Sequence, residues 1–148
     1  MLTIQNYVRA ESLEQAYELN QKKSARIIGG MLWLKMRKRP FGTAIDLSDL
    51  GLDQIEEDEK EFRIGAYVSL RELETNEALN TYTKGAFAES VKHIVGVQFR
   101  NVATVGGSLW GRYGFSDVMT IFRAMGAKVQ LHHAGILDLD EFVKMPRK

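Results

Sequence analysis

Residues Gln98–Ser108 read Gln-Phe-Arg-Asn-Val-Ala-Thr-Val-Gly-Gly-Ser, a short β-prone run that ends in a double glycine. An earlier stretch, Ala25–Leu34, has the same plan, because Ala-Arg-Ile-Ile leads into Gly29-Gly30 and then into apolar residues. Glycine lets the backbone turn with positive φ and approach a ligand closely. Consecutive amides exposed at such turns can hold phosphate oxygens, although a single Gly-Gly is also typical of an ordinary tight turn.

Neither glycine pair belongs to a common nucleotide-binding motif. The dinucleotide fingerprint needs Gly-x-Gly-x-x-Gly between a strand and a helix, and neither stretch supplies it. The segment Gly106–Gly111 has the glycine spacing of a P-loop, but Arg112-Tyr113 follows in place of Lys-Ser/Thr. The sequence therefore argues against both the Rossmann fold and a P-loop ATPase.

The composition is that of a folded globular chain. Its 148 residues include 20 Lys+Arg and 19 Asp+Glu, which gives a formal net charge of +1. Without a basic excess there is little counterion release to gain, so nucleic acid is not expected as a partner. The absence of Cys excludes a Cys-ligated zinc and an iron–sulfur cluster held by this chain alone. No apolar run reaches the ~20 residues of a membrane span, and a cytoplasmic location is expected.

Local patterns predict the order of the elements. Capping boxes at Ser12–Gln15 and Ser69–Glu72 each indicate the start of a helix. The other expected elements are a strand over 25–28, a short helix over 31–36, a strand over 43–47, a hairpin joining 52–55 to 62–64, a long helix through Phe87, Val91, Ile94 and Val95, a strand over 102–105, a helix after Ser116, a strand over 127–131 and a helix over 137–143.

We place the boundary between two lobes at residue 55. The first lobe, 1–55, is expected to be a strand-helix-strand unit with the Gly29-Gly30 turn. The second lobe, 56–148, is expected to be a mixed sheet with helices and the Gly106-Gly107 turn.

The remaining candidate residues form no recognisable site in the sequence. His93, His132 and His133 lack the spacing of metal ligands, so neither a metal site nor a catalytic residue is predicted. Trp33 and Trp110 stand beside the two glycine pairs. An aromatic ring there could line a planar ligand, while burial in the core is the more common fate of Trp.

The order of these features resembles the flavoprotein subunits of molybdenum hydroxylases, of the xanthine dehydrogenase and carbon monoxide dehydrogenase type. That family shows an apolar strand followed by Ala-Gly-Gly-Thr and an apolar helix, to which Ala25–Leu34 is similar. Its later loop has Arg-Asn, a small residue and Thr-hydrophobic-Gly-Gly-Asn, to which Arg100–Ser108 is the closer match. Asp117 stands where the family has an acid near the ribityl or ribose hydroxyls of the flavin. The resemblance covers nearly the whole chain.

The resemblance implies an α+β chain with the two-lobed FAD-binding fold of the vanillyl-alcohol-oxidase and molybdopterin dehydrogenase flavoproteins. The residues that it assigns to the FAD site are Ile27, Ile28, Gly29, Gly30, Met31, Leu32, Ile94, Thr104, Gly106, Gly107, Ser108 and Asp117. It further implies an oxidoreductase subunit, or a fragment of one, that passes electrons from iron–sulfur clusters through FAD to NAD or another acceptor. An iron–sulfur subunit and a molybdopterin-binding subunit are then the expected partners, in agreement with the absence of Cys.

Three positions depart from the family pattern. Met31 replaces Thr, Ser108 replaces Asn, and Gly111–Gly114 replaces a small-residue turn, which is expected to bring bulk and charge to the cofactor cleft. The sequence also ends at Lys148, where family members usually continue into a C-terminal domain. Two alternatives stay open: a flavin-less member that keeps the fold as a docking module for partner subunits, and a small anion-binding protein without a redox role.

Overall fold

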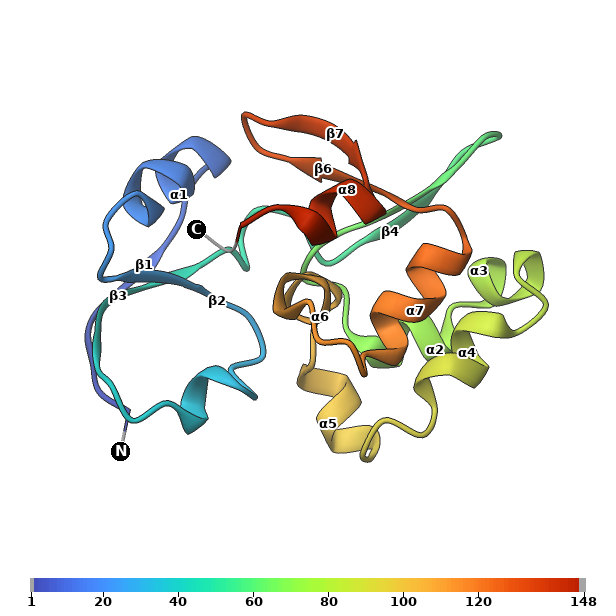
Figure 1. Cartoon of the computed structure of the whole chain (residues 1–148), viewed down its shortest axis with the longest axis horizontal. Helices are drawn as coiled ribbons and strands as arrows, with labels where there is room; N and C mark the ends of the chain where they lie inside the picture. Colours follow the sequence, from blue (N-terminus) through green and yellow to red (C-terminus); the bar gives the residue numbers. More distant parts are fainter. Residues whose placement is uncertain (1, 147–148) are drawn as a thin grey trace.

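The computed structural model describes residues 2–146 as two parts joined side by side (Figure 1). The first part contains β1 (Ile4–Arg9), α1 (Leu13–Asn20), β2 (Ala25–Ile28), the 3-10 helix η1 (Leu34–Met36) and β3 (Phe41–Asp46). The second part contains β4 (Ile55–Glu57), β5 (Phe62–Ile64), α2 (Leu70–Thr75), α3 (Glu77–Tyr82), α4 (Ala86–Val91), α5 (Val97–Val102), α6 (Val105–Gly111), α7 (Asp117–Ala124), β6 (Lys128–Leu131), β7 (Gly135–Asp138) and α8 (Leu139–Lys144).

The first part is a three-stranded parallel sheet in the order β1-β3-β2, packed against α1. The Gln15 amide donates to Ser12 Oγ at 3.1 Å, so α1 begins at the predicted cap. Small residues allow the helix to lie close to the sheet, since Ala16 and Ala25 are both buried in a core that also holds Ile45. This sheet places the end of β2, and therefore Gly29-Gly30, at the side that faces the second part.

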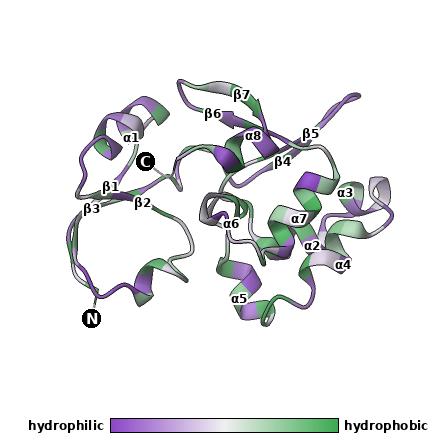
Figure 2. Ribbon diagram, in the orientation of Figure 1, coloured by the Kyte–Doolittle hydropathy of each residue, from purple (hydrophilic) through white to green (hydrophobic). Residues whose placement is uncertain are grey.

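The second part is built on one larger core shared by its helices. The fully buried side chains of Leu70, Leu73 and Val91 pack there with Phe87, whose ring lies edge-on to Phe122 at 5.1 Å. The capping box at Ser69 is present as predicted, with both reciprocal hydrogen bonds made. The tip of the β4–β5 hairpin is hydrophilic, as its acidic sequence predicts (Figure 2).

The strands of the second part differ from the expected mixed sheet. Among residues 56–146, the paired strands form two separate antiparallel hairpins, β4–β5 and β6–β7. The expected strand over 102–105 is wrong because Val102 ends α5 and Val105 begins α6, with Thr104 as the N-cap between them. One isolated antiparallel bridge, Ser69 to Thr104, is what remains of the expected pairing.

Three further element boundaries also differ from the prediction. The long helix expected through Val95 ends at Val91, and Val95 lies beyond it with φ +52°. The expected helix over 31–36 is a turn with Met31 at φ +61° and a single 3-10 turn at η1. Leu137 pairs with Val129, so the last helix begins only at Leu139. The proposed lobe boundary falls inside β4, whose first residue Ile55 pairs with Ile64.

Candidate functional site

The two glycine loops, far apart in the sequence, lie directly against each other. A Cβ atom added at Gly30 would lie 2.0 Å from the carbonyl oxygen of Val102, and one added at Gly29 would lie 3.0 Å from Thr104 Oγ1. No side chain fits at the first of these positions without moving the backbone. The absence of a side chain at Gly30 is therefore what lets the end of β2 meet the junction between α5 and α6.

The first loop presents a run of backbone donors. Within residues 2–146, the N–H groups of Gly29 through Trp33 donate to no protein acceptor. Met31 holds φ +61° in the middle of this run, a left-handed conformation that few non-glycine residues adopt. The Met31 carbonyl then accepts from the Lys35 amide at 2.8 Å, which starts the turn into η1. Successive amides around a left-handed residue form a concave anion-binding nest, so this loop fits a phosphate group.

The second loop is different, because its amides are already used within the chain. The Gly106 amide donates to the Ala66 carbonyl at 2.8 Å, and the Gly107 amide donates to Thr104 Oγ1 at 3.2 Å. The Ser108 amide and hydroxyl both donate to the Thr104 carbonyl. The amides of the second glycine pair thus have acceptors within the chain, and their contact with phosphate oxygens stays a prediction. Within residues 2–146, the Thr104 hydroxyl accepts from the Gly107 amide but donates no hydrogen bond, so its proton is available to a ligand.

Gly106 has a packing role. Its added Cβ would lie 2.8 Å from both the Cβ and the carbonyl oxygen of Ala66. The segment after β5 runs beside the loop, with the Val105 amide donating to Val68 at 2.9 Å. Gly106 therefore brings α6 against the 66–70 segment, and the segment in turn carries a residue that reaches the first loop.

That residue is Tyr67, which sequence reasoning missed. Its half-buried hydroxyl donates to the carbonyl of Ile28, directly before the first glycine pair, and accepts from the Leu47 amide at 3.0 Å. Burial raises the pKa of this phenol, so it remains a donor over the whole physiological range. Tyr67 thus fixes the end of β2 from the second part of the molecule. It stands in a stretch without a periodic or capping pattern, which left it without a sequence signal.

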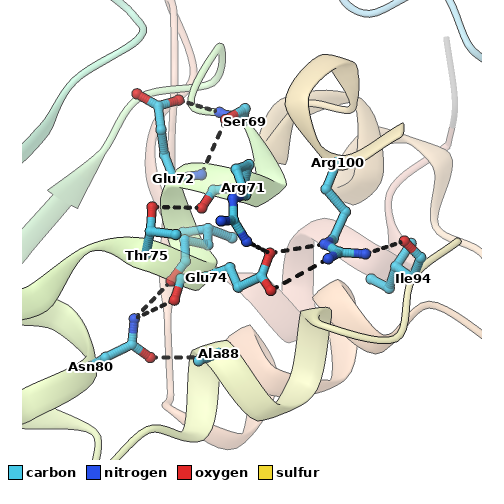
Figure 3. Close-up of polar contacts among 10 residues, drawn as sticks. Ser69, Arg71, Glu72, Glu74, Thr75, Asn80, Ala88, Ile94 and Arg100 are labelled. Carbon is cyan, nitrogen blue, oxygen red and sulfur yellow. Dashed lines mark hydrogen bonds and ion pairs between the residues drawn. The ribbon is translucent and has the colours of Figure 1, made fainter. Parts of the chain in front are cut away.

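Arg100, part of the motif that carries the resemblance, is buried, and Figure 3 shows its contacts with Glu74 and Ile94. Its side chain donates from Nε to Glu74 Oε2 at 2.9 Å and from Nη1 to the Ile94 carbonyl at 3.0 Å, with only 6% of the side chain exposed. The Arg100 hydrogen bond is the main reason that the pKa of Glu74 lies below its ordinary value, with Arg71 adding a second ion pair at 2.9 Å. Arg100 therefore positions Ile94 and the helix that ends beside Gly30.

The predicted site residues divide into two groups. The structure brings Ile28, Gly29, Gly30 and Thr104 together at the contact between the loops, while Leu32 packs against the larger core. The second group, Ile27, Ile94 and Asp117, does not take part in this contact.

Ile27 is 44% exposed on β2, and Ile94 is half-buried in the loop that Arg100 holds. Asp117 opens α7 beside its cap Ser116, and no hydrogen bond or ion pair within the described chain joins it to either loop.

The segment Gly111–Gly114, which departs from the family pattern, places an aromatic ring beside Trp33, whereas its charged residue, Arg112, contacts the C-terminal segment. The Tyr113 ring lies 5.3 Å from the Trp33 ring and stacks on Phe115 at 5.2 Å. The Arg112 guanidinium instead lies 4.2 Å from the Phe142 ring and donates to the Met145 carbonyl. The expected charge at the cleft is thus bound to the C-terminal segment, and the aromatic partner of Trp33 is Tyr113.

A family model described as the FAD binding domain in molybdopterin dehydrogenase matches residues 2–148. The chain belongs to this family. The expectation of FAD as the cofactor is thereby confirmed. No helix within residues 2–146 of this family member combines the length and the apolar character needed to cross a membrane.

The chain is similar to both an uncharacterized protein and a named enzyme. It is 26% identical over 147 residues to the uncharacterized protein YgfM of Escherichia coli K12, covering 97% of this chain and 55% of that one. It is 27% identical over 132 residues to xanthine dehydrogenase of Emericella nidulans, covering 80% of this chain and 10% of the enzyme. The chain therefore spans only about half the length of the first relative.

Solved structures of two oxidoreductases share the fold. Quinoline 2-oxidoreductase from Pseudomonas putida 86 superposes with a TM-score of 0.83 at 20% identity, covering 99% of this chain and 54% of that chain. Carbon monoxide dehydrogenase from Hydrogenophaga pseudoflava gives 0.82 at 22% identity, again covering 99% and 54%. The expected two-lobed α+β FAD-binding fold is thus confirmed.

Proposed function

We propose that the meeting glycine loops hold the diphosphate of FAD and that the chain is the FAD-binding, electron-transfer part of a multi-subunit molybdopterin-dependent oxidoreductase. The observation that carries this proposal is the unpaired run of amides from Gly29 to Trp33, set against Thr104 of the second loop. When bound, FAD supplies the exchange of one or two electrons between other redox centres.

The residues of the first loop are proposed to bind the phosphates with backbone N–H groups. Because an amide carries no formal charge, binding of a diphosphate this way depends on several donors and on a low-dielectric setting. Leu32 supplies part of that setting, since it packs against the larger core. Thr104 is proposed to donate its hydroxyl from the opposite side, where Gly106 and Gly107 are proposed to let the backbone of the second loop approach the diphosphate closely. Met31 contributes its backbone rather than the hydroxyl that the family usually has there.

The outer residues are proposed to contact the rest of the cofactor. Ile94, held in place by Arg100, offers an apolar surface, and Asp117 offers a carboxylate to sugar hydroxyls. Gly107, Ser108, Ile27 and Ile28 complete the proposed site by shaping the two loops. The exposed ring of Trp33 beside Tyr113 places an aromatic surface at the edge of the first loop. A planar ring system bound near this edge would quench the fluorescence of Trp33.

The proposed partners are an iron–sulfur subunit and a molybdopterin-binding subunit, with NAD or another molecule as the electron acceptor. Two observations support this arrangement: the chain lacks Cys, so it carries no thiolate cluster of its own, and a solved neighbour is the Cu,Mo-CO dehydrogenase. The proposed activity of the whole is therefore that of a xanthine dehydrogenase-like oxidoreductase, in which this chain supplies the flavin site alone.

The test is a binding series on the purified full chain. Absorbance near the flavin bands reports bound FAD, and titrations with FAD, FMN and riboflavin separate the diphosphate from the ring. We expect FAD to bind at least roughly tenfold more tightly than FMN, and riboflavin more weakly still, because only FAD carries the diphosphate and adenosine. Equal affinity for FAD and riboflavin would contradict the role of the glycine loops. ADP should compete with FAD, while competition by inorganic phosphate without any flavin binding would favour the anion-binding alternative.

A second candidate function is a flavin-less docking module, favoured by one observation. The amides of Gly106 and Gly107 are satisfied within the chain, so only the first loop presents free backbone donors. Co-purification of the chain with an iron–sulfur and a molybdopterin-binding subunit, while it stays colourless after incubation with FAD, would support this candidate and contradict the first.

A further inference from the structure

A second cluster of chemistry-bearing side chains lies away from the glycine loops, where α1 meets the turn between β6 and β7. Glu14 Oε2 lies 3.1 Å from His132 Nε2 and 2.8 Å from His133 Nε2. One ligand atom from each of the three residues lies within 4.8 Å of the other two. Figure 1 shows the turn of the β6–β7 hairpin reaching toward α1 across the gap between the two parts.

The backbone of the turn explains why two consecutive histidines point to the same place. Neighbouring side chains of an extended strand point to opposite faces. His133, the second residue after β6, adopts φ +64°, a left-handed conformation that breaks this alternation. The two imidazole rings consequently lie 4.3 Å apart, centroid to centroid, and the Tyr17 ring packs 4.4 Å from His133. The rings are therefore held by packing as well as by the shared carboxylate.

The three donors match the preference of borderline divalent transition metals. Two imidazole nitrogens and one carboxylate oxygen are a common set for Zn²⁺ with an open fourth position, whereas Mg²⁺ prefers oxygen ligands alone. Tetrahedral Zn²⁺ with bonds of roughly 2.0–2.1 Å separates its ligand atoms by about 3.4 Å. The present distances of 2.8 and 3.1 Å from the carboxylate to the rings need only small side-chain rotations to reach that spacing.

We propose that Glu14, His132 and His133 form a binding site for Zn²⁺ or a similar imidazole-preferring divalent ion. The ion would clamp α1 of the first part to the β6–β7 hairpin of the second. All three side chains are exposed, so water completes the coordination and the ion exchanges freely with solvent. The site shares no residue with the FAD loops, so its test is independent of the proposed function.

The experiment is calorimetric titration of the purified full chain, with any polyhistidine tag removed, after EDTA treatment and dialysis. We expect ZnCl₂ to bind saturably at one ion per chain and MgCl₂ to give no saturable binding. His132→Ala, His133→Ala and Glu14→Gln should each weaken Zn²⁺ binding by roughly tenfold or more. Two matched controls should bind as the unchanged chain does: His93→Ala, an exposed histidine elsewhere, and Glu18→Gln, an exposed carboxylate on α1.

Two outcomes would overturn the assignment. Absence of saturable Zn²⁺ binding would mean that the cluster is only a hydrogen-bonded contact between the two parts. Zn²⁺ binding that survives all three cluster variants would place the ion elsewhere. Co²⁺ gives a second readout, since a tetrahedral site with nitrogen ligands yields visible absorption bands that should be absent from His133→Ala. Far-UV circular dichroism of each variant separates lost binding from lost folding.

Discussion

Gly30→Ala tests the contact between the two loops directly. The added Cβ would lie 2.0 Å from the carbonyl oxygen of Val102, 2.7 Å from its carbonyl carbon and 3.0 Å from its Cγ1. The two nearest atoms are backbone, so no side-chain rotation relieves the overlap. Either the first loop or the end of α5 must move by about 1 Å to restore a tolerable contact. Overpacking of this kind costs roughly 1–3 kcal/mol of folding free energy.

We expect the same displacement to weaken FAD binding by about tenfold or more, because the free amides of the first loop would no longer be aligned with Thr104. Urea unfolding measures the free-energy change, and FAD titration well below the unfolding midpoint measures affinity. Gly114→Ala is the matched control, since its added Cβ meets no atom within 4 Å and its φ is not positive. Wild-type stability and wild-type affinity in Gly30→Ala would refute the reasoning. A loss of stability with unchanged FAD affinity would support the packing contact between the loops but would contradict FAD binding at this contact.

Three further predictions concern the network that holds the loops. Arg100→Met should destabilise the fold by roughly 1–3 kcal/mol in urea unfolding, because Glu74 keeps only its ion pair with Arg71 and the Ile94 carbonyl loses its donor. Adding Glu74→Leu should recover part of this loss. The pKa of Glu74 is lowered on folding, chiefly by the Arg100 hydrogen bond, so its stabilisation is complete above the ordinary value of 4.5 and is lost as pH falls through the folded value. The unfolding free energy of Glu74→Gln should therefore depend less steeply on pH in that acid range, and an equally steep profile would count against the ion pair. Tyr67→Phe should cost about 1–3 kcal/mol in the same assay, since the Leu47 amide loses its acceptor and Ile28 loses a donor.

The sequence predicted those features that depend on local rules. Ser12 and Ser69 cap helices where their side chains were expected to do so, because capping needs only residues within one turn. In the first part, the predicted strands over 25–28 and 43–47 agree with β2 and β3, whereas the helix predicted over 31–36 is only a single 3-10 turn. The motif around Arg100 led to the correct family, although the arginine itself works as a buried positioning residue.

Features that depend on distant contacts were not predictable in the same way. Val102 and Val105 favour a strand by propensity, but Val102 ends α5, and the Thr104 side chain caps the start of α6 by accepting from the Gly107 amide. The use of the Gly106 amide within the chain depends on Ala66, which belongs to no motif.

The histidine cluster shows the same limit. His132 and His133 have no metal-ligand spacing between them, and their third partner Glu14 lies more than a hundred residues earlier, on another element. The left-handed conformation of His133 in the hairpin turn brings the two rings together, and no sequence pattern predicts this conformation.

The order of strands in the first sheet has a consequence for biosynthesis. β3 is the last of the three strands in the chain but lies between the other two, so β1 and β2 have no ladder partner until residues 41–46 have been made. The residues that contact the first loop from the second part are synthesised later still: first Tyr67, and then Val102 and Thr104. A nascent chain thus carries its free amides long before it can hold them in place, and the loop acquires its final shape only once the middle of the second part has left the ribosome.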